Sequence, residues 1–115
     1  MEAKIKHQYG HFYEVTAGGE TVMAALPIER NKLIGDIMRK RYSVNDEIAL
    51  LANGSDTDKH AQELEEYQTF RASVKADIAV LQSEIDALNE AFAKESAEHE
   101  KAMSNINSEE SADKE

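Results

Sequence analysis

Histidine and carboxylate side chains are the residues of this sequence that could do metal or acid–base chemistry. His7 and His11 are four residues apart in a segment predicted to be a strand, where they would share a face but lie ~13 Å apart, too far for one metal ion. Glu95 and His99 are four residues apart in a predicted helix, a spacing of one turn that some carboxylate-bridged metal sites use. Because no second such motif accompanies this pair, we expect surface or interface histidines, with no metal and no cofactor.

The motifs of common enzyme classes are absent from the sequence. It contains no nucleophile elbow, phosphate-binding loop, dinucleotide fingerprint or calcium loop. The chain also lacks Cys, which excludes disulfides and thiolate metal sites. Gly18 and Gly19 are interpreted as a turn, not as a cradle for phosphate. We therefore predict a protein that is not an enzyme and has no catalytic residues.

The clearest pattern is an apolar repeat in the second half of the chain. From residue 74 to residue 92, apolar side chains recur at alternating steps of four and three, the repeat of a coiled coil. So narrow a stripe needs another helix to cover it, which predicts a homo-oligomer, in the first instance a dimer. The expected oligomer interface consists of Leu64, Tyr67, Val74, Ile78, Leu81, Ile85, Leu88 and Phe92. The alternative is intramolecular, with the stripe folded back on an earlier helix that carries Leu33 and Ile37.

The first 27 residues have the pattern of β-structure. Residues 12–16 and 21–26 are rich in aromatic, β-branched and other apolar side chains, and they flank a turn at Gly18 and Gly19. They predict a β-hairpin, to which residues 4–9 could add a third strand. Strands this few and short need a helix or a second subunit on one face.

Helical patterns follow Pro27. Apolar residues at helical spacing predict a first helix over residues 28–41. Ser43 and Asp46 have the spacing of a capping box for a second short helix, which Asn53 and Gly54 would end. No Gly or Pro occurs after residue 54, so one helix of roughly 70 Å could run over residues 58–104.

These segments predict an α+β fold that is mainly α. It would contain an N-terminal β-hairpin, two short helices, a long helix with coiled-coil character and a disordered C-terminal tail. The expected division is residues 1–55 for the hairpin and short helices, 56–103 for the long amphipathic helix and 104–115 for the acidic tail. The tail composition, with Ser, Glu, Asp, Asn and Lys predominating, is typical of disorder.

Charge is distributed unevenly along the chain. Residues 1–55 contain seven acidic and seven basic side chains, whereas residues 56–115 contain 16 acidic and six basic ones, giving the net charge of −10. The acidic half should repel nucleic acid and anionic membranes, so neither is an expected partner. The run Arg39, Lys40 and Arg41 is interpreted as the solvated last turn of a helix. No apolar segment approaches the ~20 residues of a membrane span, and the N-terminus lacks the pattern of a signal peptide.

One segment resembles a known group of proteins. The sequence RYSVNDEIALL over residues 41–51, followed by EYQTFR over residues 66–71 and by Val74 and Lys75, resembles small proteins of phages and prophages of gut bacteria. Those proteins are often encoded among tail or tail-fibre genes. The similarity covers about residues 39–77, and the long extension after Asp77 departs from the shorter members. The resemblance implies a viral context and assigns no functional residue here.

Two functions are compatible with these observations. The first is a phage structural or assembly protein, associated with the tail, that oligomerises through its long helix. The second is an acidic accessory protein that binds and inhibits a host protein, as nucleic-acid mimics do. The expected partners are thus the chain itself and phage-particle or host proteins, in the cytoplasm of the host bacterium or in the virion. Candidate partner-binding residues are Tyr9, Phe12 and Tyr13 on the hairpin, and Glu63, Glu65 and Glu66 on the long helix.

Overall fold

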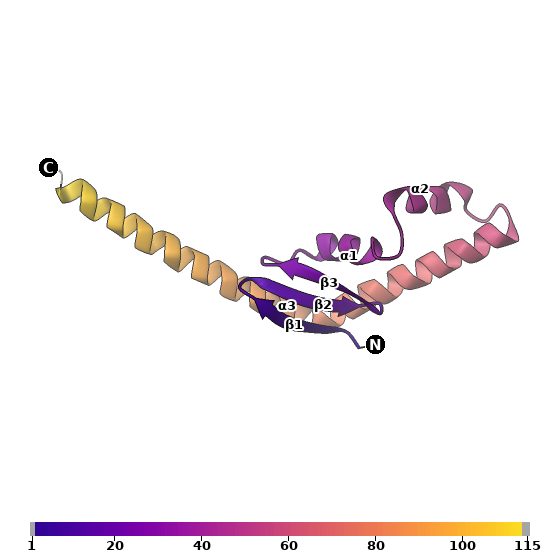
Figure 1. The fold of residues 1–115 in the computed structure, drawn as a ribbon, viewed down its shortest axis with the longest axis horizontal. Coiled ribbons are helices and arrows are strands. Elements are labelled where there is room, and N and C mark those ends of the chain that lie inside the picture. The colour runs from indigo at the N-terminus through magenta and orange to yellow at the C-terminus, as the bar shows by residue number, and fades with distance from the viewer. Residues whose placement is uncertain (1, 114–115) are drawn as a thin grey trace.

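One long helix organises the fold, and the other elements are gathered along its first part (Figure 1). The computed structural model describes the backbone of residues 2–113 and the side chains of residues 2–98. The elements are β1 (Lys4–Tyr9), β2 (Phe12–Ala17), β3 (Glu20–Ala25), α1 (Arg30–Met38), α2 (Val44–Asn53) and α3 (Asp58–Asp113). The predicted α+β class is confirmed. The side chains after residue 98 lie outside the described residues, and the predicted disorder of the acidic tail over residues 104–115 stays a prediction.

The three strands form an antiparallel sheet in the order β1-β2-β3. The register pairs Val15 of β2 with Ile5 of β1 and Val22 of β3. Val15 and Val22 are buried because this face of the sheet packs against α3, with α1 alongside β3 (Figure 1). The predicted hairpin is confirmed, and residues 4–9 supply the third strand.

Gly18 fixes the turn between β2 and β3 against α3. Its φ is +61°, in the left-handed region, and a Cβ placed on it would lie 2.6 Å from Cγ2 of Val74. Its backbone N–H also donates a hydrogen bond to Oδ2 of Asp77 at 2.7 Å. Only glycine combines this backbone conformation with so close an approach.

The apolar stripe of α3 is covered by the chain's own sheet and α1. Val74, Ile78, Leu81 and Ile85 are between 0% and 2% exposed, in one core with Leu33, Ile37 and Val15. Tyr67 is buried as well, Leu64 and Leu88 are partly buried against the same core, and Phe92 lies beside His11. Five of the eight predicted interface residues are therefore buried within the chain, whereas Leu64, Leu88 and Phe92 are only partly buried. The stripe is covered from within the chain by the sheet as well as by the helix that carries Leu33, and association with a second copy stays a prediction.

The contacts of the sheet with α3 end, within the described residues, where His11 meets the helix. The rings of His11 and Phe92 are 4.8 Å apart, and Nε2 of His11 lies 3.6 Å from a carboxylate oxygen of Glu95. We call the part of the molecule up to Glu95 the head, and residues 96–113 of α3 the arm. The molecule is 78 Å along its longest axis, with α2 near one end and the arm at the other (Figure 1).

Candidate interaction surfaces

Helix α2 begins at the capping box that the sequence predicts. The Ser43 hydroxyl accepts a hydrogen bond from the Asp46 N–H at 3.0 Å, and the Asp46 carboxylate accepts one from the Ser43 N–H at 3.0 Å. The backbone N–H of Ser43, followed by its hydroxyl, holds the pKa of Asp46 below its ordinary value. The helix ends at Gly54, whose φ is +55°. These local interactions place α2 without requiring burial of its side chains.

Few side chains attach α2 to the remainder of the head. Glu47 pairs with Arg39 at 2.9 Å, and Leu50 packs on the edge of the core. Just before α2, the ring of Tyr42 meets Tyr67 edge-on at 5.1 Å. Burial, and after it the negative charge of Glu47, raises the pKa of Tyr67. Helix α2 is therefore attached to the rest of the head by few side-chain contacts.

Another side of α2, which carries none of these contacts, is apolar and exposed. Val44, Ile48 and Leu51 are 57%, 60% and 63% exposed, and no residue of α2 is buried. Their spacing of four and three residues places them along one side of the helix, which we call the α2 face. Neighbouring large apolar side chains that remain in water are typical of an interaction site.

Helix α2 borders a groove of about 600 Å³ between α1, α2 and α3, and Leu51 is the residue of the α2 face that lines it. Leu51 lines it from α2, Arg30 and Arg39 line it from the α1 side, and Arg71 and Lys75 line it from α3. We call it the basic groove. Arg39 is paired with Glu47, whereas Arg30, Arg71 and Lys75 form no ion pair among the described side chains. Three cations therefore border an apolar wall in a chain of net charge −10.

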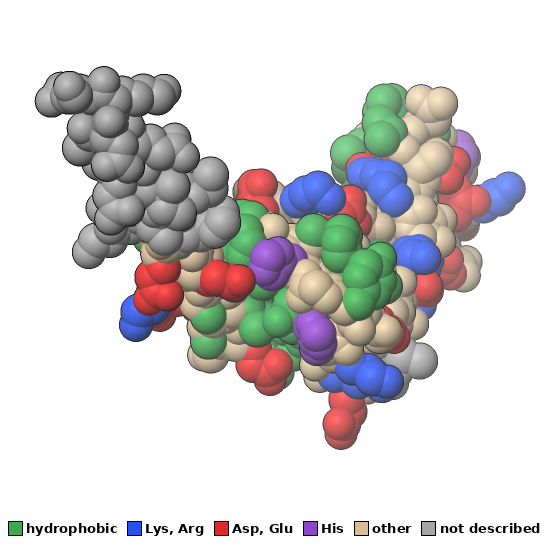
Figure 2. All heavy atoms as spheres, turned by 60° about the vertical axis from the view of Figure 1, so that its left-hand side comes forward, with side chains coloured by type: hydrophobic (Ala, Val, Ile, Leu, Met, Phe, Trp, Pro, Cys, Tyr) green, Lys and Arg blue, Asp and Glu red, His purple; other side chains and the backbone are tan. Residues whose placement is uncertain are grey.

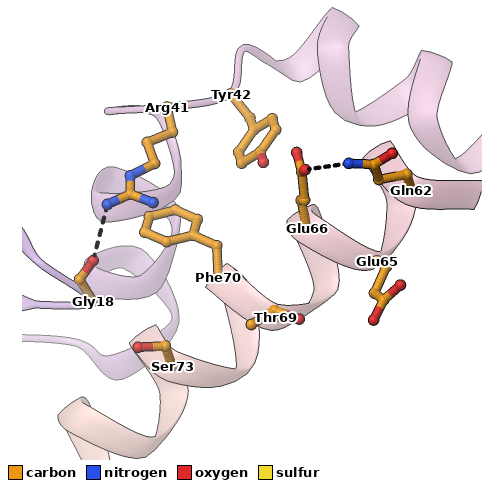
Figure 3. Close-up of a pocket in the computed structure, with 9 residues that line it drawn as sticks. All are labelled: Gly18, Arg41, Tyr42, Gln62, Glu65, Glu66, Thr69, Phe70 and Ser73. Carbon is orange, nitrogen blue, oxygen red and sulfur yellow. Dashed lines mark hydrogen bonds between the residues drawn. The ribbon is translucent and has the colours of Figure 1, made fainter. Parts of the chain in front are cut away.

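A second groove lies on the other side of the contact between α2 and α3, and Figure 3 shows its larger part. It has a volume of about 670 Å³, and an adjoining cavity of about 320 Å³ shares Arg41, Tyr42 and Glu66 with it. Glu65 lines the first part and Glu63 lines the second. The structure thus brings together the three glutamates that the sequence singled out, and we call this the acidic groove.

The one cation of the acidic groove is held by other groups. The Arg41 Nε donates to Glu20 at 2.8 Å, and its Nη2 donates to the Gly18 carbonyl at 3.4 Å. Its guanidinium carbon lies 4.2 Å from the centre of the Phe70 ring (Figure 3). The charge of Arg41 is therefore largely engaged, and the glutamates set the field of this groove.

The aromatic residues of the hairpin divide between two places. Tyr9 and Phe12 are 61% and 39% exposed, with their rings 5.1 Å apart. Tyr13 is half-buried and lies against His7 and beside Leu88 of α3. Hydrophobic and histidine side chains lie side by side on this face of the head (Figure 2). The hairpin therefore exposes two of the three predicted aromatic anchors.

No metal centre is present in the described part of the chain, where no three His, Asp or Glu side chains converge. His11 contacts Glu95, and His60 contacts Asp56. The predicted pair of Glu95 with His99 lies partly outside the described side chains. None of the described helices has an apolar segment that would reach across a bilayer.

Comparisons with protein-family models, with curated proteins and with solved structures gave no match. Sequence analysis missed the α2 face and the basic groove. The signal for the first was present, because Val44, Ile48 and Leu51 share one side of a helix that is too short to bury two sides.

Proposed function

We propose that this chain is a non-enzymatic protein-interaction module that binds a protein partner through the α2 face. The observation that carries the proposal is the exposure of Val44, Ile48 and Leu51 on a helix that buries none of its residues. Binding energy in protein interfaces comes mainly from a few apolar or aromatic anchors that become buried on association. These three side chains have that character, and the groove beside them gives a partner a concave surface to enter.

The resemblance to small phage proteins supports a role in assembly of a phage particle, at the tail. The resembling segment, residues 39–77, includes the whole of α2 and the part of α3 beneath it. The elongated shape also suits an assembly protein, because head and arm lie at opposite ends of one helix (Figure 1). We therefore place the module among structural or assembly proteins.

A second candidate function is that of an acidic accessory protein which binds a basic surface of a host protein. The acidic groove favours it, because Glu65 and Glu66 line its larger part, Glu63 and Glu66 line the adjoining cavity, and the charge of Arg41 is engaged elsewhere. A partner held there would associate by charge, so its binding would weaken steeply with salt.

Affinity purification from infected or lysogenic cells tests the main proposal. The wild-type chain is compared with a double variant, Ile48→Asp with Leu51→Asp, and with Val80→Asp as a matched control. Val80 is 74% exposed on α3, so the control also replaces an exposed apolar side chain with a charge. We expect a particle protein that is captured by the wild type and the control and lost with the double variant. Equal capture by all three would refute the proposal.

Washing the same complexes at two salt concentrations separates the two candidates. Between about 0.05 M and 0.5 M salt the Debye length falls from roughly 14 Å to about 4 Å. A partner anchored on the α2 face should survive the higher concentration. A host protein that is lost at high salt, and lost at both concentrations after Glu65→Gln with Glu66→Gln, would favour the accessory function.

A further inference from the structure

We propose that the occupant of the basic groove is the arm of a second copy of this chain, so that copies associate head to tail. This inference rests on the proposed function, because it names the partner of the α2 face. It depends on three observations: the charge and apolar wall of the groove, the charge of the arm, and the position of both along α3.

The groove selects an acidic segment with an apolar side. Arg71 and Lys75 are one turn apart on α3, and Arg30 faces the same groove from α1. Leu51 contributes an apolar side chain to the groove, and Ile48 and Val44 are exposed on the same side of α2 outside its lining. A helix lying there would place carboxylates against the cations and apolar side chains against α2.

The arm has this composition. Residues 96–113 contain five acidic residues and one lysine. The described part of α3 leading into the arm is acidic too, with Glu84, Asp86, Glu90 and Glu95 all exposed. The large apolar residues in the sequence of the arm are Met103 and Ile106.

The position of the arm excludes its own groove as the binding site. The basic groove lies at the α2 end of the head, and the arm leaves the head at the opposite end of the same continuous helix (Figure 1). The contact must therefore form between copies. Because it joins two different surfaces, each copy retains a free arm or a free groove, and association extends into open chains unless rotation closes a ring.

A nucleic-acid phosphate backbone is the competing occupant for Arg30, Arg71 and Lys75, which pair with no carboxylate among the described side chains. The surroundings oppose it, since the acidic groove lies across the α2 contact and α3 carries further carboxylates beyond Lys75. Phosphate binding also makes no use of an exposed apolar wall, whereas an amphipathic protein segment does. The observations therefore favour the arm.

Charge reversal in the full-length chain tests the proposal. A groove variant carries Arg71→Glu and Lys75→Glu, an arm variant carries Glu98→Lys and Glu100→Lys, and a control carries Glu2→Lys and Asp58→Lys, which are exposed and line neither groove. Sedimentation velocity is measured from about 10 µM to about 500 µM at low salt. We expect the mass of the wild type and of the control to rise with concentration. The groove variant and the arm variant alone should associate at least about tenfold more weakly.

An equimolar mixture of the groove and arm variants provides the decisive measurement, because each then offers a groove and an arm of opposite charge to the other. Association should return in the mixture, and helical content and Tm are measured alongside to show that each variant is folded. A wild-type chain that stays monomeric at about 500 µM, or a mixture that does not associate, would overturn the proposal. So would binding of a fluorescent single-stranded oligonucleotide that the groove variant alone loses.

The two proposals fail in distinguishable ways. If the chain is monomeric but Ile48→Asp with Leu51→Asp still abolishes capture of another protein, only the self-association is wrong. If that double variant associates with itself and captures partners like the wild type, the α2 face is not the binding surface and the proposed function fails.

Discussion

The Asn89 side chain binds both backbone groups of Ile28. Its Oδ1 accepts from the Ile28 N–H at 2.7 Å, and its Nδ2 donates to the Ile28 carbonyl at 2.8 Å. A carboxamide is the only common side chain that offers a donor and an acceptor side by side in this way. One residue of α3 thereby fixes the link between β3 and α1, and with it the start of the helix that lines the basic groove.

Replacing Asn89 should destabilise the head. We expect Asn89→Ala to lower the free energy of unfolding by about 1–3 kcal/mol, because two partly buried backbone groups lose their partners. Asn89→Asp keeps the acceptor and should cost less near neutral pH than Asn89→Ala. Urea unfolding measures both, with Asn45→Ala on the exposed side of α2 as a control expected to change stability by about 0.5 kcal/mol or less. Equal effects of Asn89→Ala and the control would contradict the assigned role.

Alanine substitutions at two glycines with similar backbone conformations distinguish the cost of backbone strain from the cost of steric overlap. Gly18 and Gly10 have φ values of +61° and +50°, but only at Gly18 does a Cβ meet another group. Gly10→Ala should cost about 1–2 kcal/mol from backbone strain. Gly18→Ala should cost a further 1–3 kcal/mol or so, because Val74 must move within the core. Thermal unfolding compares them, and equal losses would show that the turn does not press on α3 as described.

The stripe of α3 should behave as a core and not as a subunit interface. Leu81→Ala is expected to cost about 2–5 kcal/mol in a unimolecular transition, whereas Val80→Ala should cost less than about 0.5 kcal/mol. The unfolding midpoint is measured at two protein concentrations tenfold apart. A midpoint that shifts with concentration in the wild type and not in Leu81→Ala would restore the stripe as an oligomer interface.

The cap of α2 should respond to acid. Because the folded-state pKa of Asp46 is lowered, its carboxylate contributes stability that is fully present above the ordinary value of about 3.9 and is lost as pH falls through the folded-state pKa. NMR titration of the Asp46 carboxyl carbon should therefore show a midpoint below the ordinary value of about 3.9, and Ser43→Ala should move it upward. An unchanged midpoint in Ser43→Ala would mean that the capping box does not set this pKa.

Local signals in the sequence are sufficient for most of the secondary structure. Gly18 and Gly19 mark the hairpin, Ser43 and Asp46 mark the start of α2, and the absence of Gly or Pro after residue 54 leaves α3 uninterrupted. Each of these is a property of a few neighbouring residues. The elements can therefore be predicted correctly without their arrangement.

The arrangement depends on contacts between distant residues. The stripe from Val74 to Phe92 predicts a covered side of α3, but its period is the same whether a second subunit or the chain's own sheet covers it. The cations of the basic groove come from α1, from the turn after α1 and from α3. In the sequence, the acidic residues around Arg71 and Lys75 give this region a negative net charge, so a count of charge does not reveal the groove. The acidic character of Glu63, Glu65 and Glu66, in contrast, is visible in the sequence because these residues are close together in one segment.

The narrow attachment of α2 also determines how its backbone amides exchange with solvent. A helix that buries none of its residues can open without disrupting the core beneath it, so its N–H groups should exchange with deuterium faster than those of α3 near Ile78. Any protein that covers Ile48 and Leu51 would close this local route and slow the exchange. The exchange rate of the α2 amides therefore reports whether a protein is bound to the α2 face, without a label and whatever the identity of the bound protein.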